Sequence, residues 1–223
     1  MNAARILALA VAVAAVATPV HGETPMVVEP VVLGVDLGNG WMRVGTQSGA
    51  ALLAHNLWSG AWLRAHGAVA RGVQVGLSWW RPAEEGTPPT TRGHAASIDV
   101  RYARELASWL HPYGRLGLGA AWVDHERTLG AATFSGSQVL PLGVAALGLD
   151  ALMSPATWSR SPSARWRFTV GVGYEMGWVQ LAGGDWTLQS QRDLSPALTQ
   201  RDLPLGGATL AGLFQRLSFL VRF

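Results

Sequence analysis

Bulky apolar residues alternate strictly with small or polar residues along several stretches of this chain. In the stretch 168–178 every second residue is bulky and apolar, and the residues between them are Thr, Gly or Glu. Similar alternation occurs at 31–38, 72–79, 97–103 and 115–122. A period of two residues is typical of β-strands, because successive side chains point to opposite faces. The pattern therefore predicts an all-β protein.

The second face of these strands is unusual for a sheet in contact with water. Only 14% of the residues are charged, whereas the chain has 27 glycines. Ordinary soluble domains carry about 25% charged residues, and glycine weakens a strand unless close packing requires it. In a transmembrane barrel, bulky residues face lipid and the other face lines a narrow polar interior. The composition therefore favours a barrel in a membrane.

The number of predicted strands agrees with a closed barrel. Two strands are predicted within 31–60, with a turn at Asn39-Gly40, a dipeptide typical of hairpins. Six further strands are predicted near 67–80, 95–107, 113–123, 139–153, 165–180 and 211–223. The total is even, as in single-chain bacterial barrels. We therefore predict a closed antiparallel eight-stranded transmembrane β-barrel.

The first 22 residues have the features of a secretory signal peptide. Arg5 precedes an apolar run over 6–17, and Gly22 offers a small residue at the cleavage site. The run is shorter than the ~20 residues that a membrane-spanning helix needs, and Pro19 follows it. The sequence predicts a cleaved signal peptide at 1–22 and a single outer-membrane barrel domain at 23–223.

Aromatic residues gather near both ends of the predicted strands. With both termini in the periplasm, the outer girdle would contain Trp79, Trp80, Trp122 and Trp178. The inner girdle would contain Trp109, Tyr113 and Trp166. Aromatic belts at the two headgroup levels are typical of barrels that span a membrane.

The C-terminus carries a recognisable motif. Residues 216–223 alternate apolar positions and end on an aromatic residue. This segment resembles the C-terminal assembly signal of bacterial outer-membrane proteins, with a serine in place of the usual glycine. The residues of the predicted signal are Arg216, Ser218, Phe219, Val221 and Phe223.

The chain after residue 22 resembles the small eight-stranded outer-membrane β-barrels, such as the OmpA transmembrane domain and the OmpX and OmpW types. The resemblance implies a monomer surrounded by outer-membrane lipid. It also implies the barrel assembly machinery and periplasmic chaperones as partners during biogenesis.

Charged residues on the small face form the most informative polar set. The residues predicted to point into the barrel are Asp36, Asp99, Arg101, Arg115, Glu175, Arg216 and Arg222. The interior of an eight-stranded barrel is just wide enough for side chains to fill it, and a lone buried charge is costly. We therefore expect opposite charges to pair and plug the lumen. The alternative is a narrow pore, or a channel for small solutes or hydrophobic compounds.

Several other kinds of chemistry are disfavoured. Without cysteine there is no disulfide framework and no thiolate metal site. All 17 basic residues are arginine and are scattered, unlike the basic stripe of a nucleic-acid-binding protein. The histidines lack metal-ligand spacing, so we predict no metal and no cofactor. No histidine follows His125, so the His-x-Ser pair of outer-membrane lipid A deacylases is missing.

The chain is therefore predicted to have a structural or interaction role and no catalytic residues, with a lipid-modifying enzyme as the weakest alternative. Two polar connections, 82–94 and 181–210, are predicted as extracellular loops through which it would act. Loops on a rigid scaffold commonly carry binding functions.

Overall fold

The computed structural model describes residues 33–45, 57–83, 90–130, 132–153, 169–190, 202–207 and 209–223. The predicted signal peptide at 1–22 and Trp166 lie outside these residues. Ten strands are described: β1 (Leu33–Val44), β2 (Leu57–Ala70), β3 (Val73–Ala83), β4 (Thr90–Ala103), β5 (Leu110–Leu129), β6 (Ala132–Met153), β7 (Thr169–Leu181), β8 (Asp185–Ser190), β9 (Asp202–Gly207) and β10 (Leu210–Arg222).

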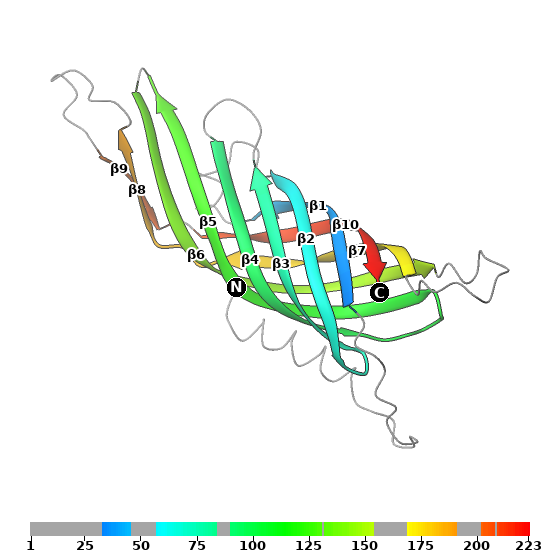
Figure 1. Cartoon of the computed structure of the whole chain (residues 1–223). Helices are drawn as coiled ribbons and strands as arrows, with labels where there is room; N and C mark the ends of the chain where they lie inside the picture. The colour runs from blue at the N-terminus through cyan, green and yellow to red at the C-terminus, as the bar shows by residue number, and fades with distance from the viewer. Residues whose placement is uncertain are drawn as a thin grey trace.

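Strands β1 to β7 and β10 close into a barrel (Figure 1). Each of β1 to β6 pairs antiparallel with the next strand, and β10 pairs with both β7 and β1. All eight strands therefore have a partner on both sides, which removes the exposed edges of an open sheet. The predicted closed antiparallel eight-stranded barrel is confirmed.

The predicted hairpin turn at Asn39-Gly40 is wrong. Both residues lie within β1, where Asn39 is opposite Ala61 and Leu217. The first turn on the side of the chain termini instead follows β2, where Gly72 has a φ of 72°. Glycine accepts this left-handed conformation without steric cost. Pairing along both edges of β1 outweighs the local turn preference of one dipeptide.

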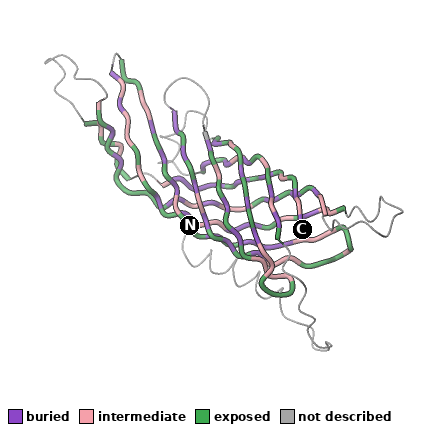
Figure 2. The backbone as a smooth tube through the Cα atoms, viewed as in Figure 1, coloured by how far each residue is buried: buried purple, intermediate pink, exposed green. Residues whose placement is uncertain are grey.

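Buried and exposed residues alternate along the barrel strands (Figure 2). The exposed positions are apolar and form a band around the barrel that includes Leu37, Leu77, Ile98, Leu118, Val172 and Phe219. An outward-facing apolar band is what a bilayer requires of a barrel. No described residues form a helix that is long and apolar enough to cross a membrane.

The apolar band ends part of the way along β5 and β6. Trp122 and Val139 are opposite one another and exposed, and the next outward pair is Asp124 and Ser137. Strands β5 and β6 are thus longer than the predicted strands at 113–123 and 139–153, and they continue beyond the apolar band (Figure 1). We call the end of the barrel that carries this extension the far end, opposite the end where β1 begins and β10 stops.

The connection predicted at 181–210 contains structure of its own. Strands β8 and β9 form a hairpin, and β8 pairs with the extension of β6 through Phe134 and Ser135. Part of the predicted loop at 82–94 is also strand, because β4 begins at Thr90. We call the extended ends of β5 and β6 together with β8 and β9 the far-end sheet.

Candidate functional site in the barrel lumen

The lumen is lined by the inward positions of each strand. The structure buries all seven of the charged residues predicted to point inward: Asp36, Asp99, Arg101, Arg115, Glu175, Arg216 and Arg222. They come from β1, β4, β5, β7 and β10, and the alternation of each strand sets their direction. The structure brings them together in one continuous group of ion pairs.

The first part of this group lies near the end of the barrel where β1 begins. Arg222 pairs with Asp36 and lies 3.1 Å from a carboxylate oxygen of Asp150. Arg101 also pairs with Asp150 and lies 3.9 Å from Asp36. His66 approaches Asp36 at 3.4 Å. Two arginines therefore bridge the same two carboxylates across the lumen.

The second part is centred on Glu175. Arg115 donates two hydrogen bonds to its carboxylate, at 2.9 and 2.8 Å. Arg216 pairs with the same carboxylate, and the Tyr113 hydroxyl donates to it at 3.1 Å. Every oxygen of Glu175 is therefore used, as a buried carboxylate requires.

Arg64 joins the two parts. Its guanidinium lies 2.7 Å from Asp99 and 3.5 Å from Asp36. Asp99 also accepts a hydrogen bond of 2.6 Å from Ser78 and lies 3.7 Å from Arg115. We call the whole set the lumen network; its charged members are Asp36, Arg64, Asp99, Arg101, Arg115, Asp150, Glu175, Arg216 and Arg222.

Three ionisable members of this arrangement were missed by the sequence analysis: Arg64, His66 and Asp150. Arg64 and His66 occupy alternate positions of β2, but bulky Trp58 and Trp62 share their inward face. The run of small residues that marks the inward face of the other strands is therefore absent from β2. Asp150 lies in β6, where Leu140 and Leu142 also point inward and conceal the alternation.

Two residues predicted for the aromatic girdles point into the lumen instead. Trp80 shares the inward parity of Ser78 and packs edge-on against Trp58, with ring centroids 5.6 Å apart. Tyr113 shares the parity of Arg115 and is buried beneath the guanidinium of Arg101. Position near the end of a strand suggested a girdle, but the period of two decides the face.

Three of the other predicted girdle residues, Trp79, Trp109 and Trp122, are exposed, and Trp178 is half-buried on an outward position. In the predicted assembly signal, Arg216 and Ser218 point inward. Phe219 and Phe223 are exposed on the lipid side, with Val221 half-buried between them.

The half of the lumen toward the far end is filled mainly by apolar side chains, beside the buried Thr91 and His125. A cluster of buried side chains fills it, contributed mainly by Met42, Trp58, Leu140, Leu142, Val179, Leu181, Leu210 and Phe214. Trp186 from β8 belongs to the same cluster and is 1% exposed. The lumen is therefore closed by two different fillings, ion pairs toward one end and packed apolar side chains toward the other.

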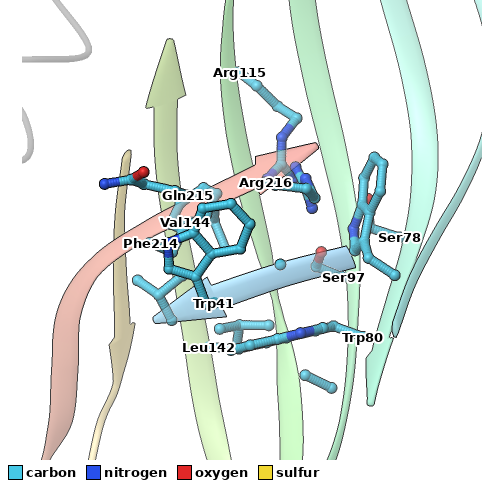
Figure 3. Close-up of a pocket in the computed structure, with 14 residues that line it drawn as sticks. Trp41, Ser78, Trp80, Ser97, Arg115, Leu142, Val144, Phe214, Gln215 and Arg216 are labelled. Atoms are coloured by element: carbon cyan, nitrogen blue, oxygen red, sulfur yellow. The ribbon is translucent and has the colours of Figure 1, made fainter. Parts of the chain in front are cut away.

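A cavity of about 40 Å³ lies where the two fillings meet. The guanidiniums of Arg115 and Arg216 lie on one side, and Trp80 and Leu142 lie on the opposite side (Figure 3). Ser97 lines the wall between them. This volume is a few times the 10–15 Å³ that one water needs.

His125 is the buried histidine of the far-end sheet. One of its ring nitrogens, Nδ1, lies 2.9 Å from the Thr91 hydroxyl, and its ring meets that of Trp186 edge-on at 6.5 Å. Burial, with a smaller contribution from Arg127, lowers the pKa of His125 to about 4. The side chain is therefore neutral at ordinary pH. Among the described residues, no three His, Asp or Glu side chains are grouped to hold a metal ion.

No family model matches this chain, and no curated protein matches its sequence. Among solved structures, it is similar to Neisserial surface protein A, at 10% identity and a TM-score of 0.48, over 86% of this chain and 95% of that one. It is also similar to the N-terminal β-barrel domain of Pseudomonas aeruginosa OprF, at 14% identity and a TM-score of 0.39, over 85% and 96% of the two chains.

A third similar structure is Ail, the attachment invasion locus protein of Yersinia pestis, at 13% identity and a TM-score of 0.44, over 86% of this chain and 98% of that one. The fold assignment itself rests on the closed strand pairing described above. This closed pairing of eight antiparallel strands is the architecture that the resemblance stated from the sequence implies.

Proposed function

We propose that this protein is a non-conducting outer-membrane barrel that presents the far-end sheet at the cell surface for interaction with a partner. In this proposal a signal peptide at 1–22 directs export, both termini face the periplasm, and the chain binds rather than catalyses. The observation that carries the proposal is the filled lumen: among the described residues, ion pairs occupy one half and packed apolar side chains occupy the other.

The composition of the filling supports a closed lumen. Ion passage needs a continuous polar path, but the apolar cluster occupies the half of the lumen toward the far end. In the other half, opening a path would break ion pairs between side chains that are at most 7% exposed. Removing one partner of such a buried pair typically costs about 3–5 kcal/mol.

The far-end sheet supports the interaction role. Strands β5 and β6 continue from the barrel wall, so the sheet is fixed rigidly to the membrane-spanning part. A small apolar cluster of Ala132, Phe134 and Leu188 holds the β8–β9 hairpin against it. A binding surface on a rigid scaffold loses little conformational entropy when a partner docks.

Planar-bilayer recording tests the closed lumen. We expect refolded protein that shows the heat-dependent gel shift of a folded barrel to produce no channel steps. Glu175→Ala removes the carboxylate shared by Arg115 and Arg216 but leaves the apolar cluster in place, so it should also produce no channel steps. Met176→Ala, on the adjacent lipid-facing position, is the matched control and should stay silent. Regular steps from the unmodified chain would overturn the proposal and support the narrow-pore alternative.

The orientation can be tested with single cysteines, because the chain has none of its own. Thr128→Cys places a thiol on the far-end sheet, and Glu105→Cys places one at the opposite end. A membrane-impermeant maleimide applied to intact cells should label the first variant alone. Labelling of Glu105→Cys without permeabilisation would contradict the proposed orientation.

A further inference from the structure

The lumen network is not electrically balanced. In the part of the lumen that the structure describes, five buried arginines face four buried carboxylates. Four of the arginines each lie within 4 Å of two carboxylates. Arg216 is paired with Glu175 alone, and Glu175 already accepts two hydrogen bonds from Arg115. The surplus positive charge therefore lies at Arg216.

Arg216 is held in place beside the cavity. Its guanidinium lies 3.3 Å from the ring centre of Trp62, on one face, and it is 6% exposed. A guanidinium stacked on an aromatic ring keeps its N–H groups in the plane, directed away from the ring. A buried charge without a full counter-charge is unfavourable, so an anion bound beside Arg216 would stabilise the network.

Two further hydrogen-bond donors line the same cavity. The indole N–H of Trp80 is buried and has no hydrogen-bond partner among the described residues. The hydroxyl of Ser97 lies on the wall between Trp80 and the arginines (Figure 3). Buried donors are nearly always satisfied in folded proteins. A ligand with acceptor oxygens would satisfy the Trp80 indole and neutralise Arg216, and it could also accept a hydrogen bond from Ser97.

The other walls of the cavity restrict the ligand. Leu142, Val144 and Val179 contribute apolar side chains, so a strongly hydrated dianion would lose its water without replacement. The volume of about 40 Å³ corresponds to roughly three waters on the 10–15 Å³ scale. An anion with a carboxylate at one end and a short alkyl group at the other matches both the charge and the walls.

We propose that this cavity is a binding site for a short-chain monocarboxylate of acetate or propionate size. Its carboxylate lies between Arg216 and Trp80, accepts hydrogen bonds from Trp80 and Ser97, and directs its alkyl group toward Val144 and Val179. The site is independent of any partner of the far-end sheet, and occupying it completes the filling of the lumen.

The indole N–H of Trp80 is a direct reporter of this site. We would titrate the refolded, ¹⁵N-labelled full chain with sodium propionate, sodium chloride or sodium sulfate at constant ionic strength. Trp80→Phe identifies the Trp80 indole signal by its disappearance. Propionate should move this signal downfield in a saturable manner, as expected when the indole donates to a carboxylate, whereas chloride and sulfate should not.

Matched variants test the location. Ala95→Leu should fill the apolar wall of the cavity and weaken propionate binding at least about tenfold, while leaving every ion pair intact. Ala96→Leu, on the neighbouring half-buried, outward position, should bind as the unmodified chain does. Ser97→Ala removes one donor without adding volume, so it checks the site if Ala95→Leu fails to show the folded gel shift.

Three results would overturn the proposal. The first is a Trp80 signal that does not respond to propionate in folded protein. The second is a response to chloride equal to that to propionate, which would assign the cavity to simple halides. The third is an unchanged propionate response in both Ala95→Leu and Ser97→Ala. None of these results depends on whether the barrel conducts or on its orientation.

Discussion

Replacement of Glu175 is the most direct test of the lumen network. Glu175 is 3% exposed and accepts hydrogen bonds from Arg115 at 2.9 and 2.8 Å and from Tyr113 at 3.1 Å, beside its pair with Arg216. Glu175→Ala leaves two guanidiniums in the lumen without this carboxylate. Removing one partner of a buried pair costs about 3–5 kcal/mol. Asp99, 3.7 Å from Arg115, offsets part of the loss, so we expect about 3 kcal/mol.

Glu175→Gln separates charge from shape. The amide keeps one acceptor for the donors around it but removes the negative charge, and hydrogen bonds to charged groups contribute about 1.5–3 kcal/mol. The free energy of unfolding should therefore fall by about 2 kcal/mol, less than for alanine. The assay is reversible urea unfolding in lipid vesicles, followed by tryptophan fluorescence.

Met176→Leu is the matched control, because Met176 is adjacent to Glu175 and 49% exposed on the lipid side. It should change the free energy of unfolding by less than about 0.5 kcal/mol. If Glu175→Ala also lies within about 0.5 kcal/mol of the unmodified chain, the buried ion-pair description of the lumen is wrong.

Three further predictions concern the far-end sheet and one glycine of the wall. Trp186→Ala should release the β8–β9 hairpin and speed proteolysis within 182–209, while the variant keeps the folded gel shift. The control variant Trp122→Ala, at an exposed position, should be cleaved by the protease at the normal rate. The pKa of His125 is about 4 in the folded chain and about 6.5 in the unfolded chain. The unfolded chain therefore binds the proton more readily, so the contribution of neutral His125 to stability is complete above pH 6.5 and declines as the pH falls toward 4. Hydrogen exchange of β8 amides should therefore accelerate from pH 7 to 5 after correction for intrinsic rates, and His125→Gln should remove this change. Gly148→Ala should lower the free energy of unfolding by about 1–3 kcal/mol, because the added Cβ would lie 2.2 Å from Tyr113 Cζ. Gly143→Ala is the control and should be tolerated in the same urea assay, because its added Cβ would have no atom nearer than 4.0 Å.

The sequence alone was sufficient for the fold class and for the direction of most charged side chains. Strict alternation is a local property, so Asp99 and Arg101 could be placed on the inner face without knowing what they contact. The same rule, applied to Tyr113 and Trp80, would have placed them inside the lumen. Their position near strand ends led to the incorrect expectation of a girdle.

Tertiary structure decided which inward residues meet. Arg222 and Asp36 are 186 positions apart in the chain and pair because β10 closes the barrel against β1. The inward direction of Arg64 was concealed because the bulky Trp58 and Trp62 lie on the same inward face of β2. The turn preference of Asn39-Gly40 was overridden because both edges of β1 are paired.

The cavity is likewise a property of the closed barrel. Arg216, Trp80 and Ser97 come from β10, β3 and β4, and no local pattern in any of these strands marks them as neighbours. A period of two fixes the face on which each side chain lies, whereas the relative register of eight strands fixes its height in the lumen. Sequence therefore determined the faces of the barrel, and closure determined the network, its surplus charge and the space beside it.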